Sequence, residues 1–324
     1  MTPFSMPRGG CQGDALWAAV LTLAVALSAA SPALAEAPRV VVTIKPVHAL
    51  VAAVMAGLGR PGLLIEGAAS PHGYALRPSD ARALSAAQLV IWVGPELERF
   101  LARPLASLAA GARVVTLIEA PGLELLAYGR GPEETGEEAG EERHEGAHQA
   151  GRHDPHLWLD PDNAAAIAAA AAAALSGLDP ANRAAYEANR AALTARIVAL
   201  DGELRAQLAP LSRVPFLVAH DGYRYFTRHF ALNGVAALAP LPGQPPGARR
   251  LAELGRLIER LGVSCLLGEP QFEPAVAKTL IRDRGLRTAT LDALGATLAA
   301  GPEAWFELMR ANSRALIACL GGSG

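Results

Sequence analysis

The sequence predicts an α/β protein with two lobes, each built on a parallel sheet of about four strands flanked by helices. Short β-branched segments alternate with helical segments in both halves of the chain, which is typical of parallel sheets covered by helices on both faces. A long helical stretch separates the two halves. The chain has 324 residues, of which 51% are hydrophobic, and this is enough for two domains of ordinary size.

The first lobe is expected to span residues 36–178. Four short apolar segments in it are typical of buried strands, and helical segments lie between them. The expected strands lie within 39–46, 62–67, 89–94 and 113–119, and the expected helices within 48–58, 78–87 and 163–175. Ser79 and Asp80 are candidates to cap the second of these helices.

A linking helix is expected over residues 179–210. Asp179 can cap it and Pro180 suits its first turn. If unbroken it would be about 40 Å long, so it could connect two lobes. The second lobe takes residues 211–324. Its strands are expected within 215–222, 234–241, 264–270 and 287–294, and its helices within 246–261 and 274–284.

The first 35 residues have the pattern of a secretory signal peptide. Arg8 precedes an apolar run, and Ala33-Leu34-Ala35 forms an A-x-A cleavage signal. The run is short for a membrane span, although an uncleaved N-terminal anchor is the alternative. We therefore expect an exported, soluble, periplasmic protein.

Cleavage would remove Cys11 and leave Cys265 and Cys319 as the only possible internal pair. In an oxidising compartment a disulfide is the natural expectation. It would stabilise the fold by about 4 kcal/mol in the chain-entropy model and would tie the C-terminal tail to the body. Two separate buried thiols are the alternative.

An acidic segment at 128–154 interrupts the regular pattern. It contains seven glutamates, six glycines and three histidines and almost no apolar residues. Such a composition predicts a mobile, solvated loop. The loop could capture a metal ion transiently, or it could be a linker with incidental histidines.

Four residues lie near the expected ends of strands in both lobes. His72 follows the second strand, His156 precedes the strand-like LWL segment, His220 ends the first strand of the second lobe, and Asp292 ends that lobe's last strand. Ligands of such sheets bind beyond the carboxyl ends of the strands, in the cleft between lobes. Three neutral imidazoles with a carboxylate or water suit zinc, but the spacing alone leaves open whether these histidines are ordinary polar residues.

The chain resembles the zinc-uptake solute-binding proteins of ABC transporters, the ZnuA-like branch of the cluster A-I metal-binding family. The resemblance covers nearly the whole mature chain. It rests on the motifs IKPVHALVAAVM, SPHGYALRPSDARAL, LVIWVGPELERF, HLWLDP, AHDGYRYF, GQPPGARRL, CLLGEPQF and TLDALG, and on the acidic loop. It implies two α/β lobes joined by a long rigid helix, with a metal between them.

The same resemblance implies that His72, His156 and His220 bind Zn²⁺. Some relatives carry a glutamate directly before the first histidine, but this chain has Pro71 there. Asp292 is then the expected fourth ligand, and a water or a loop histidine is the alternative.

Three other residues near these motifs receive different roles. His153 is expected to belong to the end of the acidic loop, and Trp158 to the core. His48 could approach the cleft, although a local hydrogen bond in the first helix is favoured.

The residue at position 220 favours zinc over manganese. Manganese and iron members of the family carry a glutamate where His220 stands, and a third imidazole shifts the preference towards zinc. A manganese-binding member of the same family is nevertheless the alternative.

Together these features predict a monomeric periplasmic carrier that passes Zn²⁺ to the inner-membrane permease of an ABC transporter. The net charge is −2, and no basic patch indicates a nucleic acid partner. A zinc buffer without a permease fits nearly as well. We expect no enzymatic activity, because a zinc hydrolase needs an open coordination position and a general base, and we expect neither an H-E-x-x-H helix nor a G-x-S-x-G elbow in this chain.

Overall fold

A computed structural model describes residues 1–3, 5, 37–127, 153–239, 246–270 and 275–321. The chain divides into two units, Met1–Ala37 and Pro38–Gly324, and the second contains every helix and strand described below. The expected signal peptide and nearly all of the expected acidic loop lie outside the described residues.

The first lobe contains a four-stranded sheet in the order β2-β1-β3-β4, with all pairs parallel. The strands are β1 (Val40–Val42), β2 (Gly62–Leu63), β3 (Leu89–Trp92) and β4 (Arg113–Thr116). Every residue of β1 and β3 is buried, which explains their continuous apolar runs. Helices α2 (Lys45–Val54), α3 (Pro78–Ala86) and α4 (Ala102–Leu108) belong to this lobe.

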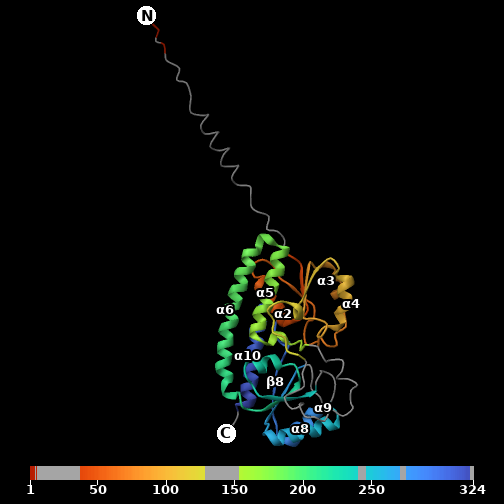
Figure 1. Ribbon diagram of the computed structural model, residues 1–324. Coiled ribbons are helices and arrows are strands. Elements are labelled where there is room, and N and C mark those ends of the chain that lie inside the picture. The colour runs from red at the N-terminus through yellow and green to blue at the C-terminus, as the bar shows by residue number, and fades with distance from the viewer. Residues whose placement is uncertain (4, 6–36, 128–152, 240–245, 271–274, 322–324) are drawn as a thin grey trace. The chain divides into compact units, whose positions relative to one another are not determined.

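The second lobe repeats this arrangement with a sheet in the order β6-β5-β7-β8, again parallel throughout. The strands are β5 (Phe216–His220), β6 (Gly234–Ala239), β7 (Cys265–Gly268) and β8 (Arg287–Thr290). Helices α7 (Arg224–His229), α8 (Ala248–Leu261) and α9 (Ala275–Arg284) accompany them, with α8 and α9 adjacent in Figure 1. The predicted fold class, two lobes with parallel four-stranded sheets, is confirmed.

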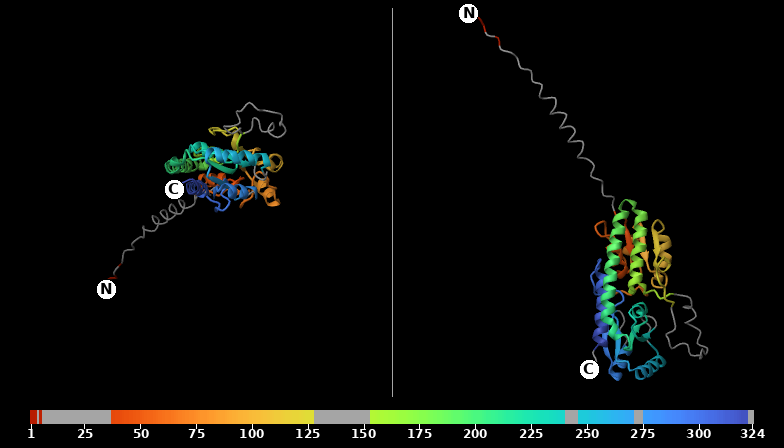
Figure 2. Two further views of the ribbon diagram at one scale, coloured as in Figure 1. Left: turned by 90° about the horizontal axis from the view of Figure 1, so that it is seen from below. Right: turned by 60° about the vertical axis from the view of Figure 1, so that its left-hand side comes forward.

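The long helix predicted between the lobes is α6 (Arg183–Leu208), preceded by a 3₁₀ turn at Pro180–Asn182. It packs against α5 (Pro161–Leu178) and α10 (Ala304–Leu320), and Figure 2 shows it running beside both lobes. Its buried residues include Leu193, Ile197, Leu200 and Leu204. This spacing makes one apolar stripe that faces the core.

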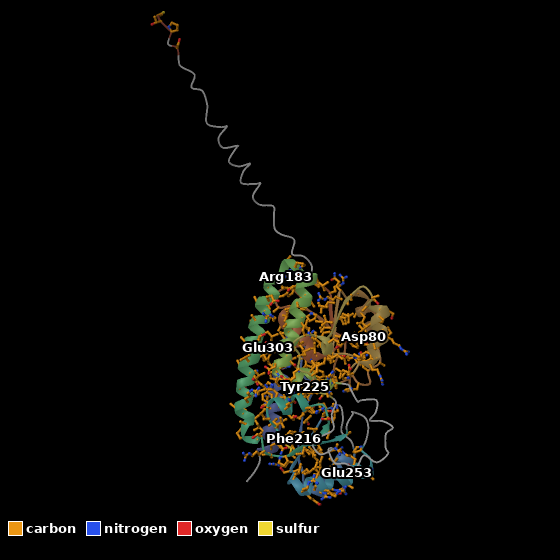
Figure 3. The ribbon with its side chains drawn as sticks, in the orientation of Figure 1. Asp80, Arg183, Phe216, Tyr225, Glu253 and Glu303 are labelled. Carbon is orange, nitrogen blue, oxygen red and sulfur yellow. A yellow bond between two sulfur atoms is a disulfide. The ribbon has the colours of Figure 1, made fainter. Side chains whose placement is uncertain are left out.

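Helix α10 is a second connection between the lobes, and our sequence analysis did not predict it. It packs on α2 of the first lobe and on β7 and β8 of the second. The indole Nε1 of Trp305 donates to the backbone oxygen of Trp158 at 2.8 Å. Near the start of α10, Glu303 accepts from Arg196 of α6 at 2.6 Å (Figure 3). One hydrophobic core therefore runs through both lobes.

Three local predictions need correction. The LWL segment (Leu157–Leu159) forms a 3₁₀ helix and not a strand, and its three side chains are buried, which accounts for its apolar composition. Asp179 accepts from Tyr186 and Asn182 side chains instead of capping backbone amides. Asp80 does accept from the amide of Arg77, but the Ser79 hydroxyl bonds to Asp80.

Cys265 and Cys319 form a disulfide, so this prediction is confirmed. The bond joins the first residue of β7 to the end of α10 and closes a sequence separation of 54 residues. It thus fixes the helix that packs on both lobes.

Replacing both cysteines by serine is expected to lower the free energy of unfolding by about 4 kcal/mol, because a loop of this length loses much entropy when cross-linked. Chemical denaturation of the oxidised protein and the variant measures this difference. Equal midpoints for the two proteins would contradict the assignment of a stabilising role to the bond.

Candidate metal site

Three histidine side chains from both halves of the chain meet in one place. His220 is the last residue of β5, His156 directly precedes the 3₁₀ helix Leu157–Leu159, and His72 lies in the loop between β2 and α3. One ring nitrogen from each lies within 4.8 Å of the others. The ring centroids of His156 and His220 are 5.0 Å apart, and His72 lies 5.5 and 5.8 Å from them. This geometry can hold one metal ion with three imidazole ligands.

A buried carboxylate orients the ring of His156. Asp154 is fully buried, and its Oδ1 lies 2.8 Å from Nδ1 of His156 and 3.0 Å from the backbone nitrogen of the same residue. The carboxylate requires a proton on Nδ1, so Nε2 keeps its lone pair. A carboxylate behind an imidazole is the common way in which proteins fix the tautomer of a metal-binding histidine.

His220 has the same arrangement in the second lobe. Its Nδ1 lies 3.2 Å from Oε1 of Glu269, and both side chains are almost completely buried. The Nε2 atoms of His220 and His72 are buried without any hydrogen-bond partner. Buried polar atoms are nearly always satisfied in proteins, so unpartnered nitrogens that converge indicate a missing ligand.

His72 is held in the neutral form that a metal needs. Burial, followed by repulsion from His156 and His220, lowers the pKa of His72 to about 3. A proton therefore does not compete for this nitrogen near neutral pH.

Negative charge lies around the three imidazoles. Burial, then the charge of Asp154, raises the pKa of Asp221. Burial, then the charge of Glu269, raises the pKa of Tyr223. The carboxylates are thus crowded into a dry region, and a bound dication would relieve their repulsion.

The remaining walls of the pocket are mainly apolar. Besides the histidines and Glu269 they consist of Ser70, Pro71, Leu97, Trp158, Ala293 and Leu294. Trp158 is completely buried, as expected for core packing, and its ring lies 5.4 Å from that of His156. Such walls keep water away from the ligand rings and strengthen their interaction with a cation.

The structure does not bring Asp292 together with the three histidines. Its carboxylate accepts from the backbone nitrogens of Leu294, Gly295 and Ala296 at 2.9, 2.8 and 2.6 Å. Asp292 lies two residues beyond the end of β8, and these three hydrogen bonds satisfy its carboxylate. Asp292 as the fourth ligand stays a prediction.

Two other histidines lie outside the group of three. His48 Nε2 is 3.0 Å from the backbone oxygen of Pro61, which lies 13 residues away and beyond the end of α2, so the bond is not the local one expected within the first helix. The backbone of His153 forms an isolated antiparallel β-bridge with that of Ala127.

A second cluster of metal-ligating types, Asp160, Asp162 and His229, is an ion-pair network. His229 Nδ1 lies 3.2 Å from Asp160, and Nε2 lies 2.7 Å from Asp201 of α6. Burial lowers the pKa of His229, but its bonds to the two carboxylates outweigh this and raise it. Both ring nitrogens are therefore engaged, and the cluster links α7 to α5 and α6.

Sequence reasoning missed Asp154 and Glu269. Asp154 stands two residues before His156, and this spacing could have indicated an orienting carboxylate. Glu269 lies 49 residues beyond His220, so only strand order could have placed it there: β7 is the neighbour of β5.

The fold and the site together define a two-lobed α/β protein in which three histidines that could hold a metal ion converge. A family model described as "Zinc-uptake complex component A periplasmic" matches residues 40–319. The chain belongs to this family, and the resemblance inferred from its motifs is confirmed.

Named relatives agree with this placement. The "High-affinity zinc uptake system protein ZnuA" of Brucella abortus is 39% identical over 313 residues, which cover 88% of this chain and 92% of that protein. The protein of the same name from Paracoccus denitrificans is 39% identical over 318 residues, covering 93% and 98%.

Solved structures share the fold. A zinc-bound deletion mutant of ZnuA has a TM-score of 0.73 at 27% identity and covers 89% of this chain and 100% of its own. The solute-binding protein FpvC of Pseudomonas aeruginosa, with Mn²⁺, has a TM-score of 0.74 at 23% identity and covers 89% and 100%; it shows the fold alone. Within the described ranges, no helix is both long and apolar enough to cross a membrane.

Glu269→Gln is expected to weaken zinc binding by roughly 10- to 100-fold, because loss of an orienting carboxylate usually costs a metal site that much. Competitive titration with a chromogenic chelator measures the effect. Glu253→Gln is the matched control, since Glu253 lies on α8 and pairs with Arg249 at the surface (Figure 3). Equal losses in both variants would contradict the role of Glu269.

The metal-free protein is expected to lose stability as the pH falls from 6.5 towards 3. The unfolded chain protonates His72 near the ordinary pKa of 6.5, whereas the folded chain does so only near 3. The unfolded state binds more protons in this window, so the free energy of unfolding falls by up to about 1.4 kcal/mol per pH unit from this group. Denaturation of wild type and His72→Gln at several pH values measures it. A variant with the same pH slope as the wild type would contradict the assignment.

Proposed function

We propose that the protein binds Zn²⁺ tightly between its lobes in the periplasm and delivers it to the permease of an ABC transporter. One observation carries the proposal: three imidazoles from both lobes converge, of which His156 and His220 are buried and His72 is half-buried, and two of the three have Nε2 atoms without any partner. The names of the relatives support zinc uptake as the purpose of the site.

The ligand types favour zinc as the cargo. Three neutral nitrogen donors suit zinc, whereas manganese prefers sites richer in carboxylate oxygen. The nearest carboxylates, Asp154 and Glu269, face the Nδ1 atoms of the ligand rings. They therefore tune the imidazoles and leave the metal side to nitrogen.

The fourth coordination position is best supplied by water. Asp292, the ligand expected from the sequence, would have to give up three hydrogen bonds from backbone nitrogens. Hydrogen bonds to a charged group contribute about 1.5–3 kcal/mol each. A water needs no such rearrangement.

Location and partner follow from separate observations. The N-terminal segment has the pattern of a signal peptide, and the Cys265–Cys319 disulfide suits an oxidising compartment. The permease is the proposed partner because the description of the family names a component of a zinc-uptake complex. We propose that the carrier acts as a monomer and has no enzymatic activity.

His72→Ala, His156→Ala and His220→Ala are each expected to weaken zinc binding at least roughly 100-fold, because each removes one of three protein ligands. Titration of the metal-stripped mature protein should find one tight zinc. His144→Ala is the matched control, and deletion of residues 130–150 tests the acidic segment.

If the three histidine variants bind zinc normally and deletion of residues 130–150 abolishes binding, the proposal is wrong and the protein is better described as a zinc buffer. If a strain that lacks the gene for this protein still takes up zinc normally in low-zinc medium, that result argues against delivery to a permease. Hydrolysis of generic esters or phosphates faster than by free zinc would revive the enzyme alternative.

A further inference from the structure

The segment 292–298 forms part of the metal pocket and is bonded to the opposite lobe. It follows β8 in the second lobe, and two of its residues, Ala293 and Leu294, line the pocket. The Ala293 oxygen accepts from the indole of Trp158 in the first lobe at 2.7 Å. Trp158 stands two residues after the ligand His156, so this bond already joins the pocket wall to the ligand side.

A buried lysine makes the larger connection. Lys45 is the first residue of α2 in the first lobe and only 6% exposed. Its ammonium donates to the backbone oxygens of Gly295, Ala296 and Leu298 at 2.5, 3.3 and 2.8 Å. All three of its donors are used, and all three acceptors belong to the segment 292–298.

Asp292, the first residue of the segment 292–298, organises the backbone of the same segment. It accepts from the backbone nitrogens of residues 294–296. Residues 295 and 296 thus give their nitrogens to an anion and their oxygens to a cation. The backbone of Asp292 is itself bonded twice to Asn312 of α10, with both bonds at 2.8 Å. The wall is rigid only while both charges stay in place.

We propose that Lys45 is a positioning residue of the zinc site. It holds the segment 292–298 against the first lobe and thereby slows the release of metal. This inference rests on the proposed function. Lys45 does not touch the metal, since its ammonium is fully occupied by the three carbonyls. Removing its charge frees the wall next to the ligands without removing a ligand.

Lys45→Met tests this inference. In stopped-flow experiments with excess chelator, the variant is expected to release zinc roughly 10- to 100-fold faster, the usual cost of disturbing groups behind a metal site. Its association rate should stay within about threefold. The absorption bands of the Co²⁺-loaded variant should match those of the wild type, because the ligand set is unchanged. The matched control is Lys278→Met, the same substitution at an exposed lysine of α9, which should release zinc as the wild type does.

The outcomes separate this inference from the proposed function. A wild-type protein that binds no zinc would overturn the proposed function. Zinc release from Lys45→Met at the wild-type rate would overturn the positioning role alone. If Lys45→Met does not fold, Lys45→Arg replaces it, because a guanidinium keeps the charge but spreads its donors over a planar fork, whereas the three carbonyls here converge on the single Nζ atom. Faster release from the folded Arg variant supports the inference. Release at the wild-type rate, or failure of both variants to fold, overturns it.

A further variant separates the two roles considered for Asp292. With Asp292→Asn, faster zinc release and unchanged Co²⁺ bands support the organising role described above. Altered Co²⁺ bands would make Asp292 a ligand and overturn that role.

Discussion

Three imidazoles that meet in one dry pocket, two of them (His72 and His220) with an Nε2 atom that lacks a partner, are the constraint on which the rest of the structure depends. Neutral histidines in such a place need partners on their other nitrogens, and Asp154 and Glu269 supply two of them. Those two carboxylates are themselves buried, and burying their charge costs stability unless a cation balances it. The site is therefore an arrangement that a dication completes.

This constraint explains why the two lobes are so firmly joined. His220 and Glu269 belong to the second lobe, whereas His72, His156 and Asp154 belong to the first. Helices α6 and α10 pack beside both lobes, and the disulfide fixes the end of α10. The Tyr225 hydroxyl of α7 adds bonds to the Asp154 oxygen at 3.1 Å and the Leu126 nitrogen at 2.9 Å, near the junction shown in Figure 3. Small shifts of one lobe would therefore change the distances between ligands.

The sequence predicts the repeated parts well, because parallel strands carry continuous apolar runs that need no knowledge of distant contacts. It also places His220 at the end of a strand. It fails where a long-range contact decides, since LWL becomes a 3₁₀ helix. Helix α10 is a different case: its buried residues recur at helical spacing, as at Trp305, Met309 and Leu316, and our sequence analysis overlooked this local pattern. Lys45 and Gly295 are 250 residues apart, so no periodicity could link them. The place of Asp292 after a strand is the same for a ligand and for an organiser of backbone amides, so the sequence alone does not separate the two roles.

Zinc-edge X-ray absorption of the stoichiometric zinc complex tests the central claim most directly. The account predicts three imidazole nitrogens at about 2.0–2.1 Å with one further oxygen, and the loss of one imidazole in His220→Gln. A first shell made mainly of oxygen, or a spectrum that His220→Gln leaves unchanged, would contradict it.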